Sequence, residues 1–122
     1  MTIIPIPHDA LFKQFLTDPK VAKDFLETYL PNKIKNLCNF STLKLEPGSY
    51  VEKNLRQHFS DIVYSLKISE TDSYIYTLIE HLTTPKKLTS FTLLRYQIAI
   101  MKQHLNKGHG TLPVVVPLLF YR

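Results

Sequence analysis

Two apolar stretches decide the fold of this chain: FSDIVYSLKI at residues 59–68 and YIYTLIEHL at residues 74–82. Both are rich in β-branched and aromatic residues, which favours strands. The polar residues 70–72 between them are typical of a turn, so a hairpin of antiparallel strands is the simplest connection. Each stretch also carries one acidic residue, Asp61 or Glu80, among apolar neighbours.

Helices are predicted on both sides of this hairpin. Apolar residues recur at helical spacing in residues 8–16 and again from Pro19 until Pro31 ends the pattern, and Asp9 and Asp18 are the expected N-caps. A longer helix is expected from residue 85 until a glycine at 108 or 110. Its buried face is predicted from seven residues at helical spacing, which are Leu88, Phe91, Leu94, Arg95, Ile98, Met101 and Leu105.

Two further strands complete the predicted sheet. Residues 43–45 alternate before a turn signal at 46–49, and LPVVVPLLFY at 112–121 is a continuous apolar run, typical of a strand buried on both faces. A strand that follows a crossover helix usually joins the same sheet in parallel. The predicted fold class is therefore α/β, a mixed sheet flanked by helices. Because the chain stops at Arg122, directly after this strand, we expect a fragment or a truncated gene product.

Composition bounds the class of protein. The 122 residues fit one domain, and 44% apolar residues are enough for a core. The net charge of +5 suits a polyanion partner, but it also simply favours solubility. Cys38 is the single cysteine, so a reducing compartment is expected. Neither a secretory signal nor the roughly 20 apolar residues that cross a membrane are visible, which predicts a soluble cytoplasmic protein without a membrane partner.

The acidic residues within the strands suggest a metal site. A carboxylate inside an apolar strand is costly to bury unless something compensates it, and two of them can converge on a divalent cation. Metal-dependent phosphodiesterases use such carboxylates. Because side chains alternate along a strand, the position sharing a face with Glu80 is Leu82, which offers no polar group. The structural alternative places Asp61 at an exposed edge beside Arg56 or Lys67 and makes Glu80 the mark of a strand end.

Six segments, in order along nearly the whole chain, carry a resemblance to a known family. They are the motif His8-Asp9-x-x-Phe12-Lys13, then residues 43–50, 59–65, 74–81, 94–96 and 112–121. In these segments the chain resembles the Rpn family of recombination-promoting nucleases, also described as YhgA-like transposases, of the PD-(D/E)XK nuclease superfamily. The resemblance implies a magnesium-dependent DNA endonuclease with the core order helix, three strands, helix, strand.

Carried over residue by residue, the resemblance implies that Asp61 and Glu80 are the catalytic and metal-binding acids, with Mg²⁺ or Mn²⁺ as cofactor. Family members usually read Glu-His-Gln where this chain has Glu80-His81-Leu82. The departure removes the polar group expected to orient the attacking water. Family members also continue beyond the tyrosine that matches Tyr121, so residues 1–122 are expected to form a single Rpn-like nuclease domain, the N-terminal portion of a longer architecture.

Four further residues are accessory candidates. Asp9 is a candidate third acid, since related nucleases often place one on the first helix, although a helix cap explains it as well. Arg95 is a candidate contact to phosphate or a partner of a buried acid. Lys86 and Lys87 are candidates for contacts to the DNA backbone that are blind to sequence, with a solvated helix face as the ordinary alternative.

The predicted function is that of a DNA endonuclease domain that promotes recombination, hydrolyses phosphodiesters with a metal-activated water and has double-stranded DNA as partner. The alternative is a catalytically degenerate or truncated remnant that only binds, either to DNA or to a full-length paralogue. A homo-oligomer is a further partner prediction. A zinc site is not predicted, because Cys38, His104 and His109 lack a second close pair of ligands.

Overall fold

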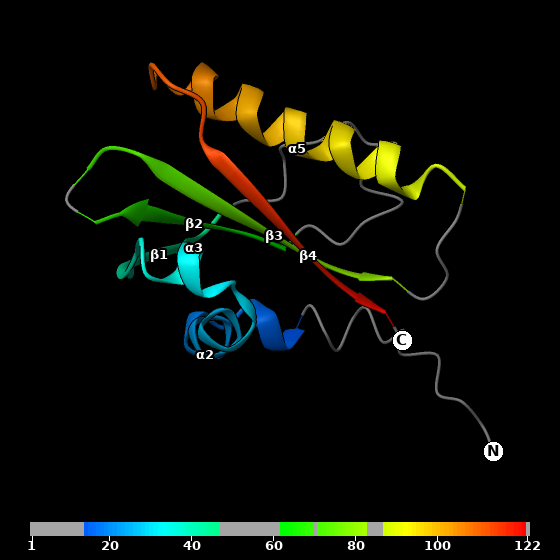
Figure 1. Cartoon of the computed structure of the whole chain (residues 1–122), viewed down its shortest axis with the longest axis horizontal. Coiled ribbons are helices and arrows are strands. Elements are labelled where there is room, and N and C mark those ends of the chain that lie inside the picture. The colour runs from blue at the N-terminus through cyan, green and yellow to red at the C-terminus, as the bar shows by residue number, and fades with distance from the viewer. Residues whose placement is uncertain (1–13, 47–61, 70, 83–86, 122) are drawn as a thin grey trace.

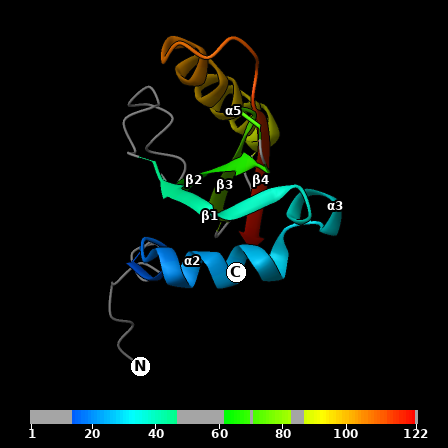
Figure 2. The same ribbon diagram turned by 90° about the vertical axis from the view of Figure 1, so that its left-hand side faces the viewer.

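A mixed four-stranded sheet separates two layers of helix in the computed structural model, which describes residues 14–46, 62–69, 71–82 and 87–121. The strands are β1 (Cys38–Leu45), β2 (Ile62–Ile68), β3 (Tyr74–Leu82) and β4 (Val114–Tyr121). Helices α2 (Pro19–Tyr29) and α3 (Asn32–Lys35) lie on one side of the sheet and α5 (Thr89–Asn106) on the other (Figures 1 and 2). The predicted α/β class is confirmed.

The strand order β1-β2-β3-β4 follows the chain. Strands β2 and β3 pair antiparallel from Ile62 opposite Ile79 to Lys67 opposite Tyr74, so the predicted hairpin is confirmed. Strand β1 also pairs antiparallel with β2. Strand β4 pairs parallel with β3 after the α5 crossover, as the sequence predicts.

Strand β4 is less buried than its apolar sequence predicts. It is an edge strand of the described sheet, and Pro117 within it, which has no N–H to donate, is tolerated at such an edge. Alternate side chains pack toward the two helix layers, but they stay partly exposed because β4 has a neighbour on only one side. These side chains are Val115 and Leu119 toward α5, and Val116, Leu118 and Phe120 toward α2.

Helix α2 begins and ends where local sequence predicts. The Asp18 side chain accepts a hydrogen bond of 3.0 Å from the Lys20 N–H, which satisfies one of the unpaired donors at the helix start. Pro19 occupies the first helical position, where its missing N–H costs nothing. Of the helix expected at residues 8–16, the structure describes residues 14–16, and they are helical. The Asp9 cap lies outside the described residues.

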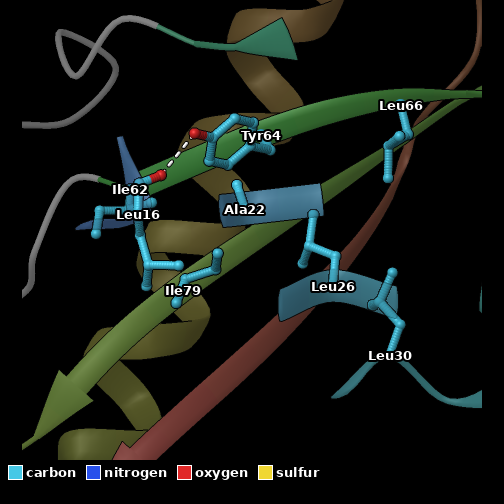
Figure 3. Packing of buried hydrophobic residues seen from close by; sticks show 8 residues of the cluster. All are labelled: Leu16, Ala22, Leu26, Leu30, Ile62, Tyr64, Leu66 and Ile79. Carbon is cyan, nitrogen blue, oxygen red and sulfur yellow. Dashed lines mark hydrogen bonds between the residues drawn. The ribbon is translucent and has the colours of Figure 1, made fainter. Parts of the chain in front are cut away.

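The core beneath α2 is made of apolar side chains and the ring of Tyr64, whose hydroxyl is buried with them (Figure 3). It comprises Leu16, Ala22, Leu26, Leu30, Ile62, Tyr64, Leu66 and Ile79. The Tyr64 hydroxyl donates a hydrogen bond of 2.5 Å to the Leu16 carbonyl oxygen. Burial, reinforced by the Asp18 carboxylate, raises the pKa of Tyr64 to about 12, so the hydroxyl keeps its proton and remains a donor.

Tyr64→Phe should lower the free energy of unfolding by about 1–2 kcal/mol, because the buried Leu16 carbonyl would lose its partner without gaining access to water. Tyr29→Phe is the matched control, since Tyr29 is more than half exposed. Urea denaturation followed by circular dichroism measures both. A Tyr64→Phe protein as stable as the Tyr29→Phe protein would contradict the role given to this hydrogen bond.

Helix α5 buries a different face from the predicted one. Its buried residues are Leu93, Tyr96, Ile100 and His104, which pack over Val63, Tyr76 and Leu78 of the sheet or lie beside them. The predicted apolar face is largely exposed, with Phe91, Leu94, Ile98 and Leu105 between 41% and 57% accessible. The predicted face did not include Tyr96 or His104. Both have aromatic bodies that pack in a core once the polar tip has a partner.

Within residues 14–46, 62–69, 71–82 and 87–121, no helix combines the length and apolar character that crossing a membrane requires.

Candidate functional site

Glu80 is a fully buried carboxylate within β3. It shares a face of the strand with Leu78, two residues earlier, and Leu78 belongs to the core beneath α5. Its exposed fraction is 0%, and its backbone pairs with Leu119 of β4. Glu80 is therefore not an exposed residue marking a strand end, because β3 continues to Leu82. A carboxylate so deeply placed requires a charged or hydrogen-bonding group that compensates its burial.

The second predicted acid, Asp61, lies outside the described residues. The described register of the hairpin stops at Ile62, which stands opposite Ile79, the residue before Glu80. Asp9 and Lys86 also fall outside the described part of the chain. Their assigned roles stay predictions.

The remaining predicted site residues are near α5 or at the end of β3. Leu82 is the last residue of β3, and its backbone pairs with Tyr121. Arg95 lies on α5 and is exposed, and Lys87 is exposed two residues before that helix. Among the described residues, no three His, Cys, Asp or Glu side chains gather closely enough to hold a metal ion. A metal site at Glu80 therefore depends on a ligand from outside these residues.

The structure also assembles a polar cavity of about 210 Å³ that sequence reasoning missed. It opens on the α5 side of the sheet, where β1, β2 and β3 meet the segment after α5. Its lining residues are Thr42, Lys44, Glu46, Ser65, Lys67, Tyr74, Tyr76, Lys107 and His109. Polar residues two apart on each strand were an available signal, because such residues share a face.

A hydrogen-bonded aromatic cluster borders this cavity. The Tyr76 hydroxyl lies 2.8 Å from Nδ1 of the buried His104, and the rings of His104 and His109 stack with centroids 4.0 Å apart. The pKa of His104 is lowered, chiefly by burial and then by His109 and Lys107. The pKa of Tyr76 is raised to about 12 by burial, with smaller contributions from Glu46 and Tyr74. These shifts favour the neutral imidazole of His104 and keep the proton on the Tyr76 hydroxyl.

Cys38 lies at the start of β1 and is partly buried. Its Sγ donates to the Ile34 carbonyl oxygen at 3.2 Å. Burial raises the pKa of this thiol, which disfavours the thiolate that a nucleophile or a metal ligand needs. The contacts of Cys38 are those of a structural residue.

The fold and site define a small α/β domain with a buried carboxylate in the central pair of a mixed sheet. The chain belongs to the family described as "Putative transposase, YhgA-like", whose model matches residues 6–122. It is therefore a member of a family of recombination-promoting nuclease-like proteins, as its relatives' names also indicate.

Three relatives from Escherichia coli K12 illustrate the match. The chain is 52% identical to the recombination-promoting nuclease RpnA over 94% of its own length and 39% of RpnA. It is 50% identical to the inactive recombination-promoting nuclease-like protein RpnE, with 94% and 38% covered. It is 48% identical to the protein named "Putative inactive recombination-promoting nuclease-like protein YjiP" over 78% of this chain and 92% of YjiP. The chain thus spans less than half the length of RpnA and RpnE. No solved structure matches it.

Proposed function

We propose that this chain is a magnesium-dependent DNA endonuclease domain of the PD-(D/E)XK type that promotes recombination, with Asp61 and Glu80 as its catalytic, metal-binding acids. The observation that carries this proposal is the complete burial of the Glu80 carboxylate in β3, directly after Ile79, which pairs with Ile62 of β2. The family relationship supports the same activity, since RpnA carries the name of a recombination-promoting nuclease.

The proposal extends the antiparallel register by one residue. Ile62 stands opposite Ile79, so a ladder continued by one residue would bring residue 61 opposite Glu80. Carboxylates directly opposite each other repel unless a cation lies between them. Mg²⁺ is commonly held by one or two carboxylates together with waters and substrate phosphates, so this pair fits the ion.

The chemistry follows from this donor set. When bound, Mg²⁺ lowers the pKa of a coordinated water and neutralises charge that develops on the scissile phosphate. The Glu80 carboxylate would hold the ion at the end of β3, and its apolar surroundings would strengthen the attraction by excluding water. Leu82 adds no hydrogen bond with which to orient the attacking water. Arg95, Lys86 and Lys87 are proposed to contact the phosphate backbone of double-stranded DNA.

A second function is favoured by Leu82. Without a polar group at this position, the domain would bind without turnover, and two relatives, RpnE and YjiP, are themselves named as inactive. In this alternative the partner is DNA, a second copy of the chain or a full-length paralogue. Both functions suit a reducing, cytoplasmic location, given a DNA partner and a single cysteine.

Glu80→Gln should weaken the binding of Mn²⁺, used as a probe for Mg²⁺, by about tenfold or more, because a neutral amide replaces a charged oxygen ligand. Electron paramagnetic resonance of free Mn²⁺ measures this directly and needs no cleavage. Glu27→Gln is the matched control, since Glu27 is exposed on α2 and pairs only weakly with Lys23 at 3.9 Å. Equal Mn²⁺ affinity in the Glu80→Gln and Glu27→Gln proteins would refute the metal site.

A further inference from the structure

The polar cavity lies away from the proposed metal site. Tyr76 in its lining precedes Glu80 by four residues of β3, which corresponds to roughly 13 Å along a strand. In Figure 1 the C-terminal end of α5 lies toward the β2–β3 turn, whereas its N-terminal end lies toward the end of β3. The cavity borders the first of these ends, because Lys107 and His109 follow α5. The cavity is therefore separate from the proposed metal site, and its ligand has to be inferred from its own lining.

The floor of the cavity is buried and needs a hydrogen-bond donor. Glu46, Ser65 and Tyr76 are each at most 6% exposed. The Glu46 Oε2 atom is shielded from solvent and accepts no hydrogen bond from any residue that the structure describes. Its ion pair with Lys107, at 3.7 Å from Nζ, is too long to replace one. A buried carboxylate oxygen in this position favours a ligand that brings an N–H group.

The rim of the cavity is cationic. Lys44 and Lys107 are exposed, and Lys67 is partly buried, with its ammonium group 5.7 Å from the centroid of the Tyr74 ring. Among the described lining residues, three lysines accompany one carboxylate, Glu46, which leaves an excess of positive charge. A phosphate monoester carries a charge of about −1.5 to −2 at neutral pH and would neutralise this excess.

We propose that this cavity binds a single nucleotide, with its phosphate at the lysine rim and an amino group of its base on Glu46. A nucleotide supplies both groups that the lining favours. The lysine rim favours an anion, and the Glu46 carboxylate on the buried floor favours a hydrogen-bond donor. The volume of about 210 Å³ is smaller than the roughly 300–1,000 Å³ of pockets that enclose drug-sized ligands, so it takes one base-sized group. Glutamate accepts a hydrogen bond from the cytosine N4 amino group in the same manner.

A free mononucleotide and an unpaired nucleotide of a DNA strand share this chemistry. Neither requires the chain to cleave DNA, so the test is made in EDTA, where the proposed metal site cannot act. Isothermal titration calorimetry of the 122-residue chain measures its affinity for deoxycytidine monophosphate, for deoxycytidine and for inorganic phosphate. We expect the monophosphate to bind about tenfold more tightly than either of the other two.

Lys44→Gln combined with Lys67→Gln should reduce affinity for deoxycytidine monophosphate about tenfold and leave that for deoxycytidine unchanged. Lys33→Gln, an exposed lysine of α3 outside the cavity, is the matched control. Glu46→Gln should reduce the preference for deoxycytidine monophosphate over thymidine monophosphate, which lacks the amino group. The rim variants keep the test valid if Glu46→Gln unfolds the protein, because their side chains are not part of the buried floor.

Two further probes separate the sources of the ligand. Tighter binding of a short single-stranded deoxycytidine oligomer than of the monophosphate, lost in the rim variant, would identify a DNA strand as the source. Equal binding of the two would identify the free mononucleotide. The proposal is overturned if the monophosphate binds no better than inorganic phosphate, or if the rim variant binds it as well as Lys33→Gln does.

Discussion

Leu82→Gln is expected to raise cleavage of supercoiled plasmid with Mg²⁺ by about 100-fold or more. The sequence predicts that positions 80 and 82 share a strand face, because side chains alternate along a regular strand, and a glutamine amide at 82 would then orient the water that attacks the phosphate. A positioned hydrogen-bonding group of this kind is typically worth on the order of 10²-fold in rate. The starting protein should bind divalent metal yet cleave weakly, because this group is missing.

Three controls make the gain interpretable. Adding Glu80→Gln to the Leu82→Gln protein should abolish the gain, which excludes a contaminating nuclease. Leu112→Gln is the matched control, since Leu112 is 64% exposed and lies before β4. Circular dichroism confirms the fold of each variant. A folded Leu82→Gln protein that stays inert with both Mg²⁺ and Mn²⁺ would contradict the nuclease proposal and leave the binding function in its place.

Ile100→Ala is expected to lower the free energy of unfolding by about 2–5 kcal/mol, the usual cost of removing a large aliphatic side chain from a core. Ile100 is fully buried between α5 and the sheet. Ile98→Ala on the same helix is the matched control, because Ile98 is 53% exposed, and it should change stability by less than about 1 kcal/mol. Single domains are stable by only about 5–15 kcal/mol, so the first change removes a large share.

Urea denaturation of the two alanine variants distinguishes the observed face of α5 from the one that sequence periodicity predicts. If the predicted face were the buried one, the order of the two effects would be reversed, with Ile98→Ala the more damaging. Equal destabilisation by both substitutions would mean that the exposed stripe is also covered in solution. In that case the burial assigned to α5 would be wrong.

The sequence by itself determined the elements and much of their order. Apolar β-branched runs marked β2 and β3, and the polar turn between them favoured an antiparallel hairpin. Asp18 and Pro19 marked the start of α2 through local hydrogen bonding and backbone geometry. These features were predictable because each depends on residues only a few positions apart. The presence of an acid within β3, Glu80, was equally visible.

Only the tertiary structure decided which surfaces became buried. Helix α5 carries two stripes at helical spacing, and the sheet buries the one in which His104 finds a hydrogen bond to Tyr76. The half-buried state of β4 follows from its place at the edge, which no local pattern encodes.

The polar cavity likewise depends on residues from three strands and the end of α5. Glu46 and Lys107 meet at 3.7 Å although they are far apart in sequence. Burial and charge are properties of the assembled chain, because they depend on which distant surfaces exclude water from each other. Local propensity therefore determined the strands and helices, and the packing of the sheet against α2 and α5 decided where their polar groups could act.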